Sequence, residues 1–334
     1  MCPVITAEAH TLAIARGGTW GLYNNNEHFA YGKGDIKLAP RCSQKPQGLW
    51  KKIFFLLGIV LGLGVLAPAS ALAWGPGMHL ALGNQILNNL HLLSASVAEI
   101  LAANVQAFRY GCLSADILVG KGRRLTPTHC HSWQAGLRMI HTVVDPRLQA
   151  YAYGYLSHLA ADVVAHNYYV ANVLQLGRAR GKLTHVYIEM QADRQTIYCP
   201  TELKRVMKTS LPDADALLLS TLRKSRLTFS LKKRLFKSGV ALSRNATTAS
   251  SLQLLSRQFP DRECGEYLCD MRELSFQASV DCLNRGHESV VVTFDPMGFE
   301  NLGLVKQSLP QKAGSSISGP FLNFFIPAMS LLTL

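Results

Sequence analysis

GYLSHLAADVVAH, residues 154–166, is the stretch of sequence that most constrains the fold and the chemistry of this chain. Its apolar residues predict a buried helix, and on a helix each step of four residues advances about 40° around the axis. His158, Asp162 and His166 fall at such steps, so their side chains share one face. Imidazole nitrogens and carboxylate oxygens are ligands that Zn²⁺ takes in catalytic sites, so this face is a candidate metal site.

A second segment, HVYIE at residues 185–189, repeats the step of four with His185 and Glu189. A single histidine on an apolar helix is usually an ordinary core or surface residue. Five ligand-type residues on two helical faces are different, because buried unpaired imidazoles and carboxylates cost free energy that something must compensate. The two segments together therefore predict a metal centre.

The composition is that of a globular protein with a sizeable core: 334 residues, 48% hydrophobic and 16% charged, with a formal net charge of +13. Residues 49–73 predict a signal peptide, because Lys51 and Lys52 precede an apolar run that ends in Ala-Leu-Ala. The alternative is a membrane anchor, since the run is about 20 residues long. We favour cleavage, and hence an exported protein, periplasmic or secreted. Residues 1–48 are either a disordered extension or sequence upstream of the true start.

Cleavage after Ala73 would give a mature chain that begins at Trp74. The free amine and the carbonyl of Trp74 could then chelate one metal ion, with His79 close enough to join them. The alternative is that Trp74 is an aromatic plug and His79 lies at a helix start. Taken alone, these two residues favour the alternative.

Two further positions carry ligand-type side chains. Asp116 is a lone carboxylate in an apolar stretch, where it is either a helix N-cap or a metal ligand. His129, Cys130 and His131 are consecutive, and alternating side-chain directions would let the two histidines face one site while the cysteine faces away.

Six cysteines follow residue 73, which permits disulfides in an exported chain, and one bridge is plausible among Cys264, Cys269 and Cys282.

The C-terminal region, residues 200–334, is predicted to be helical and basic. Residues 200–244 contain eleven Lys or Arg against three Asp or Glu. This charge is either a solvated face or a surface for anionic lipid headgroups or nucleic acid, although aromatic residues are not interleaved with it. Residues 288–295, ESVVVTFD, predict a strand. The apolar tail, residues 319–334, is short for a membrane span and could pack on the body or touch a membrane.

The ordered set of candidate ligands resembles the zinc-dependent phospholipase C family, which is related to the S1/P1-type nucleases. The set comprises Trp74, His79, Asp116, His129 or His131, His158, Asp162, His166, His185 and Glu189. The resemblance covers residues 74 to about 193. It implies an all-α, multi-helix domain in which such ligands hold three zinc ions, so residues 74–199 would be the trinuclear catalytic core and the rest a helical extension.

The resemblance also implies which side chains hold which ion. One zinc would be held by Asp116, His131, His158 and Asp162. A second would be held by His166, His185 and Glu189. The third would be held by the Trp74 amine and carbonyl, His79 and Asp162. His131 is preferred to His129 because the aromatic Trp133 follows it at the family's distance.

Three features of the sequence bear on this resemblance, and two of them point to different members of the related pair. The gap from Asp162 to His166 is four, whereas both groups usually have six. The spacing of five from Trp74 to His79 is more similar to the nucleases, whereas Glu189 is similar to the phospholipases.

We therefore expect an exported zinc-dependent phosphodiesterase that hydrolyses phospholipid headgroups through a zinc-activated water, with Asp116 as candidate general base. Its partners would be a phospholipid or other phosphodiester substrate and a membrane surface. The first alternative is an S1/P1-type single-strand nuclease or 3′-nucleotidase, which would bind nucleic acid. The second is a non-catalytic, membrane-associated zinc protein.

Overall fold

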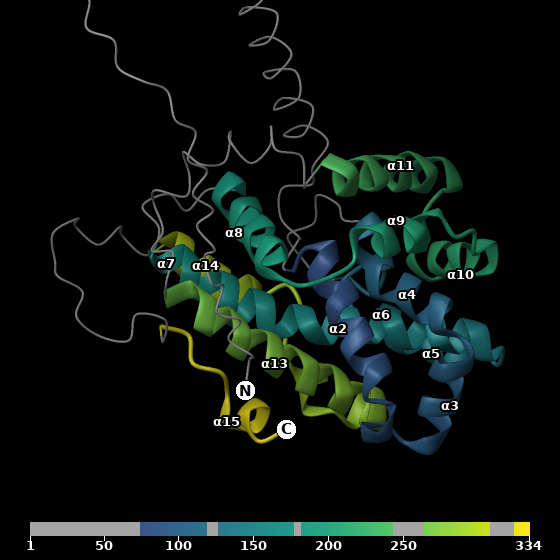
Figure 1. Cartoon of the computed structure of the whole chain (residues 1–334), viewed down its shortest axis with the longest axis horizontal. Helices are drawn as coiled ribbons and strands as arrows, with labels where there is room; N and C mark the ends of the chain where they lie inside the picture. Colours follow the sequence, from purple (N-terminus) through teal and green to yellow (C-terminus); the bar gives the residue numbers. More distant parts are fainter. Residues whose placement is uncertain (1–73, 119–125, 177–181, 243–262, 308–323) are drawn as a thin grey trace, which may run out of the picture. The chain divides into compact units, whose positions relative to one another are not determined.

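The computed structural model describes residues 74–118, 126–176, 182–242, 263–307 and 324–334 (Figure 1). The predicted extension (1–48), the predicted signal peptide (49–73) and the first part of the apolar tail (319–323) lie outside the described residues. Every regular element within the described ranges is helical, which confirms the predicted all-α fold. By their contacts, all the described residues fall in one unit, Gly64–Leu334.

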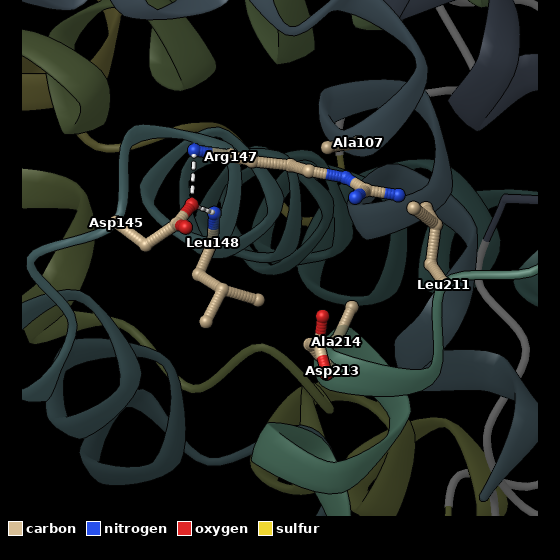
Figure 2. A pocket seen from close by; sticks show the side chains of 7 residues that line it. All are labelled: Ala107, Asp145, Arg147, Leu148, Leu211, Asp213 and Ala214. Carbon is tan, nitrogen blue, oxygen red and sulfur yellow. Dashed lines mark hydrogen bonds between the residues drawn. The ribbon is translucent and has the colours of Figure 1, made fainter.

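Helix α6 (Pro146–Val164) is the helix that residues 154–166 predicted, and it is buried along most of its length. Asp145 caps its N-terminus: Oδ1 accepts hydrogen bonds from the backbone N–H groups of Arg147 and Leu148, at 2.7 and 3.1 Å (Figure 2). Pro146 takes the first helical position, where no N–H is needed. The helices α4 (Val105–Ile117), α5 (Trp133–Thr142) and α13 (Glu263–Arg285) pack against α6.

Helices α4 and α6 approach closely because glycines face each other where they cross. A Cβ atom on Gly154 would lie 2.1 Å from the carbonyl oxygen of Phe108. A Cβ on Gly111 would lie equally close, 2.1 Å, from the carbonyl oxygen of Tyr151. Any side chain at either position would push the helices apart, so this crossing holds the end of α4 against the polar face of α6.

The remaining elements follow in chain order around this pair. They are α2 (Pro76–Asn88), η1 (Leu90–Leu92), α3 (Ala95–Ala103), the π-turn η2 (Ala165–Tyr169), α7 (Val170–Leu176), α8 (Lys182–Gln195), α9 (Pro200–Lys208), α10 (Pro212–Leu222), α11 (Arg226–Leu242), the 3₁₀ turns η3 (Gly286–Glu288) and η4 (Val290–Thr293), α14 (Phe299–Gln307) and α15 (Met329–Leu332).

The strand predicted at residues 288–295 is wrong, because Glu288 ends the 3₁₀ turn η3 and Val290–Thr293 form the 3₁₀ turn η4. The Ser289 hydroxyl accepts a hydrogen bond from the backbone N–H of Val291 and caps the second turn. The side chain of Val291 is fully buried. Neither turn is paired with a strand, since the described ranges contain none, and tertiary packing overrides the β propensity of the valines.

The end of the apolar tail packs on the body of the protein. The backbone N–H of Phe325 donates to Oδ1 of Asn172 at 2.9 Å, and Nδ2 of Asn172 donates to the carbonyl of Phe325 at 3.0 Å. Leu331 in α15 is fully buried. Among the described residues, no helix has the length and apolarity needed to cross a bilayer.

Cys282 is a buried free thiol, so it takes no part in the bridge predicted with Cys264 and Cys269, and the side chain of Cys264 lies outside the described residues. A small pocket between the starts of α6 and α10 contains none of the predicted ligands (Figure 2). It is lined by Ala107, Asp145, Arg147, Leu148, Leu211, Asp213 and Ala214.

Candidate metal centre

Helices α4 and α6 and the turn before α5 bring four of the predicted ligands together. Nε2 of His158 lies 3.2 Å from Nε2 of His131, and each of these nitrogens lies 3.1 Å from Oδ2 of Asp162. Oδ1 of Asp116 lies 3.5 Å from Nε2 of His131 and 3.6 Å from Nε2 of His158. All four side chains are buried, so two imidazoles and two carboxylates point at one place away from solvent.

Asp116 is not a helix N-cap, because α4 ends at Ile117 and the carboxylate lies in its last turn. A negative charge there is unfavourable for the helix, whose C-terminus carries partial negative charge. The position of Asp116 is therefore explained by its contacts with the two histidines and not by helix capping.

A second group lies on the continuation of α6 and on α8. Nε2 of His185 lies 2.8 Å from Oε1 of Glu189, and the rings of His166 and His185 have centroids 5.7 Å apart. One ligand atom from each of His166, His185 and Glu189 lies within 4.8 Å of the others. The continuation of α6 and the helix α8 therefore bring these three side chains together.

His79, in the first turn of α2, also contacts the first group. Its Nε2 lies 3.2 Å from Oδ1 of Asp162, and its ring stacks on His158 at a centroid distance of 3.8 Å. The indole of Trp74 is fully buried, donates from Nε1 to the Ser275 hydroxyl at 3.1 Å and lies 4.8 Å from the ring of Tyr169. The proposed chelation by the Trp74 amine and carbonyl stays a prediction.

His129 lies beside the first group and not in it. Its Nδ1 accepts a hydrogen bond from the backbone N–H of His131 at 3.1 Å. Cys130 does not face away as expected, because its Sγ lies 3.3 Å from Nδ1 of His131. The two residues form a separate cluster with His131, on the far side of that ring from Asp162.

Most of these ligand-type atoms are buried without a hydrogen bond, which is rare for polar atoms in folded proteins. The buried atoms that lack one include both ring nitrogens of His79, both oxygens of Asp116, Asp162 and Glu189, and Nε2 of His166. Three carboxylates in one interior repel one another and are costly to bury unless a cation compensates them. Nitrogen and carboxylate donors at these separations fit zinc.

A family model described as zinc dependent phospholipase C matches residues 78–235, a range that spans both groups. Residues 78–235 belong to the zinc-dependent phospholipase C family. No curated protein and no solved structure matches the chain. The match includes α4, α6 to α8, most of α2 and the turn before α5, which together carry all the grouped ligands.

In this phospholipase C-type centre, backbone carbonyls fix the orientation of two histidines. Nδ1 of His158 lies 2.9 Å from the carbonyl oxygen of Cys112, and Nδ1 of His166 lies 2.6 Å from that of Pro296. Because a carbonyl can only accept, each Nδ1 donates its proton there, so Nε2 is the ring nitrogen that could bind a metal. His131 has the Cys130 thiol in the equivalent place.

Burial and neighbouring charges set the protonation of the phospholipase C centre. Burial raises the pKa of Asp162, but His158, His131 and His79 lower this pKa by more, so it falls well below its usual range. Burial, and next the charge of His158, lowers the pKa of His79. An ionised carboxylate and a neutral imidazole are the forms that bind metal. For Glu189, burial first and then Asp116, Asp162 and Asp193 hold the pKa well above its usual range.

Two supports of the phospholipase C centre were missed by sequence reasoning. Asp193 accepts hydrogen bonds from the backbone N–H groups of Gly77 and Met78, and it could have been found because it extends the steps of four from His185 and Glu189.

The second support is the loop 295–298, which covers the π-turn. Besides the Pro296 carbonyl, it supplies the Asp295 carbonyl, which accepts from Asn167 at 2.7 Å. A Cβ on Gly298, which has φ +55°, would lie 2.7 Å from the backbone carbon of His166. No local signal in the sequence predicts this loop, because its role depends on residues about 130 positions away.

Proposed function

We propose that this chain is an exported zinc-dependent phosphodiesterase that hydrolyses phospholipid headgroups in the manner of a phospholipase C. Membership of the family supports a zinc hydrolase of this type. The observation that carries the finer assignment is the pair of adjacent buried groups, one around Asp162 and one around Glu189, whose carboxylate oxygens lack hydrogen bonds.

The proposed ligand sets follow these groups. One zinc takes Asp116, His131, His158 and Asp162, and a second takes His166, His185 and Glu189. The third takes His79 and Asp162 together with the amine and carbonyl of Trp74. The last set requires cleavage after Ala73, since only then does Trp74 have a free amine. The proposal of three ions therefore depends on export, whereas the first two sets do not.

The proposed reaction is attack of water on the phosphodiester phosphorus. The bond from phosphorus to the diacylglycerol oxygen breaks, and the products are diacylglycerol and the phosphorylated headgroup. Bound zinc supplies charge stabilisation for the phosphate and activation of water at neutral pH. Asp116, whose oxygens make no hydrogen bond, accepts the proton of the attacking water. His158 and His166, fixed by their carbonyl partners, hold the geometry of the centre.

The direct test uses the secreted chain loaded with zinc and vesicles of phosphatidylcholine. We expect release of phosphocholine and diacylglycerol, loss of this release on His158→Ala, and no effect of His141→Ala, because His141 is exposed and belongs to neither group. Zinc content close to three per chain, with Trp74 as the first residue, supports the full assignment. The absence of both products from every headgroup tested would contradict it.

A single-strand nuclease is the second candidate. It is favoured by the spacing of Trp74 and His79 and by the basic surface of α11. Cleavage of denatured DNA that is lost on His158→Ala would favour the nuclease over the phospholipase C. Metal-dependent folding without turnover of either substrate would instead support a zinc protein without catalysis.

A further inference from the structure

Helix α11 leaves two leucines in solvent. Leu227 is 86% exposed and Leu231, one turn later, is 60% exposed. Large apolar side chains exposed side by side on one helix face have a functional explanation more often than single ones do. The other face of α11 shows that these leucines are not needed to hold the helix in place.

Three residues on the inner face of α11 attach the helix to the body of the protein. Phe229 is buried in the core. Nζ of Lys233 lies 2.7 Å from Oδ2 of Asp215 and 4.8 Å from the centre of the Tyr110 ring. Nζ of Lys232 donates to the carbonyl of Leu118 at 3.2 Å. The helix is therefore attached through Phe229, Lys232 and Lys233, whereas Leu227 and Leu231 face solvent.

The charge around the two leucines has one sign. Residues 223–242 contain seven Lys or Arg and no Asp or Glu. Lys232 and Lys233 face the body, whereas Arg223, Lys224, Arg226 and Arg234 are exposed. A basic border around an exposed apolar stripe is typical of helices that lie in the interface of an anionic membrane.

The turn before α11 holds a charged residue in a backbone conformation that favours glycine. Arg223 ends α10 with φ +53°, a left-handed conformation that favours glycine, and the N–H of Lys224 closes the turn on the carbonyl of Leu219 at 3.1 Å. Glycine at this position would relieve the strain. The chain has arginine there instead, on the same exposed basic border.

α11 is also attached close to the metal centre. Leu118, the acceptor for Lys232, lies two residues after Asp116 at the end of α4. The exposed leucines and the proposed catalytic residues are thus carried by elements that touch.

We propose that the outer face of α11, with the turn before it, docks this protein on an anionic lipid surface. Leu227 and Leu231 enter the interface, and the exposed Arg and Lys side chains contact headgroup phosphates. The inference rests on the proposed phospholipid substrate, since docking there brings the centre to its substrate. Lipid is favoured over nucleic acid because the exposed apolar residues are leucines, whereas single strands bind through aromatic stacking.

The experiment is sedimentation of the zinc-loaded chain with vesicles of phosphatidylcholine and phosphatidylglycerol, compared with phosphatidylcholine alone. We expect binding to the anionic vesicles that weakens with salt. Leu227→Ala with Leu231→Ala should weaken it by about tenfold or more, as should Arg226→Gln with Arg234→Gln. The matched control is Leu304→Ala with Lys306→Gln, which changes an exposed leucine and an exposed lysine on α14 and should leave binding unchanged.

A further variant separates charge from stability. Arg223→Gly should keep or raise the melting temperature, because glycine favours the observed φ, while it weakens vesicle binding. A residue that serves only the fold would change stability and leave binding alone.

Binding of the leucine variant equal to that of the unchanged chain overturns the docking proposal. Binding of single-stranded DNA that is lost on the arginine changes, with no effect of either change on vesicles, overturns it as well. Hydrolysis of monomeric short-chain phosphatidylcholine should be unchanged in the leucine variant. If the chain binds vesicles through α11 but hydrolyses no phospholipid, docking stands and the proposed function fails.

Discussion

Asp193 accepts a hydrogen bond of 2.8 Å from the backbone N–H of Met78, the residue before His79. The other carboxylate oxygen accepts from the N–H of Gly77 at 2.9 Å, so one side chain on α8 caps the start of α2. A Cβ on Gly75 would lie 2.3 Å from the carboxylate carbon of Asp193. The carboxylate therefore holds together two helices that each carry a predicted ligand, His79 on α2 and Glu189 on α8.

The first prediction follows from this cap. Asp193→Ala should lower the free energy of unfolding by about 1–3 kcal/mol, because two buried N–H groups lose their acceptor. Zinc bound per chain should fall as the first turn of α2 loosens. Denaturant unfolding and metal analysis measure the two effects. Asp213→Ala, an exposed acid in the first turn of α10, is the control and should leave the zinc content unchanged. Full zinc content in Asp193→Ala would show that the cap does not position His79.

The predictable part of this site is the part that depends on local periodicity. Residues 154–166 form the expected helix, and steps of four place His158 and Asp162 on one face, because helical geometry alone decides this. The same rule places His185 beside Glu189. The helical fold could likewise be predicted from the spacing of apolar residues.

What the sequence does not predict depends on contacts between distant segments. The π-turn at Ala165–Tyr169 begins one residue before His166 and widens the helix locally. This widening occurs where Asp162 and His166 are separated by a step of only four residues. The choice between His129 and His131 depends on which ring reaches Asp162. The valines of residues 288–295 have strand propensity, but α13 and the core decide their conformation.

The second prediction concerns removal of the metal. In the chelated chain, Glu189→Gln should raise stability, because a buried acid beside Asp116 and Asp162 is replaced by a neutral group. The pKa of Glu189 is raised in the folded chain, so the unfolded chain releases its proton above about pH 4.5 while the folded chain retains it. The stability of the chelated protein therefore falls as pH rises through this window, and Glu189→Gln should remove that fall.

With zinc present, the effect of Glu189→Gln on stability should change sign. Glu189→Gln should then lower the melting temperature, since a charged ligand is lost. Melting curves in chelator and in zinc, from pH 4.5 upward, give both comparisons. Asp281→Asn, which removes an acid on α13 outside both groups, is the control and should show no change of sign. The same sign for Glu189→Gln in both conditions would contradict zinc binding at Glu189.

The third prediction concerns the Cys130 thiol, 3.3 Å from Nδ1 of His131. Cys130→Ala should weaken zinc binding by about 10- to 100-fold, because the imidazole loses the partner that orients it. Cys130→Ser keeps a hydrogen-bonding group and should retain most of the affinity. Competition titration with a chelator measures the difference. Cys282 is a buried free thiol outside both groups, so Cys282→Ala controls for the loss of a buried sulfur. Equal zinc affinities for Cys130→Ala and Cys130→Ser would contradict the orienting role of the thiol.

The fourth prediction tests the loop that holds His166. Gly298→Ala should destabilise the protein by about 1–3 kcal/mol, because φ +55° is unfavourable for alanine and the new Cβ would meet the backbone of His166 at 2.7 Å. The loop would have to move, and the hydrogen bond from His166 to the Pro296 carbonyl would lengthen, so zinc at His166, His185 and Glu189 should be lost before zinc at Asp162. Gly303→Ala, five residues on, is the matched control: it lies inside α14 with open space around it and should be neutral or stabilising by about 0.5–1 kcal/mol. Stepwise zinc release followed by unfolding measures both variants. Equal loss from the two groups in Gly298→Ala would mean that the loop supports the whole centre and not His166 in particular.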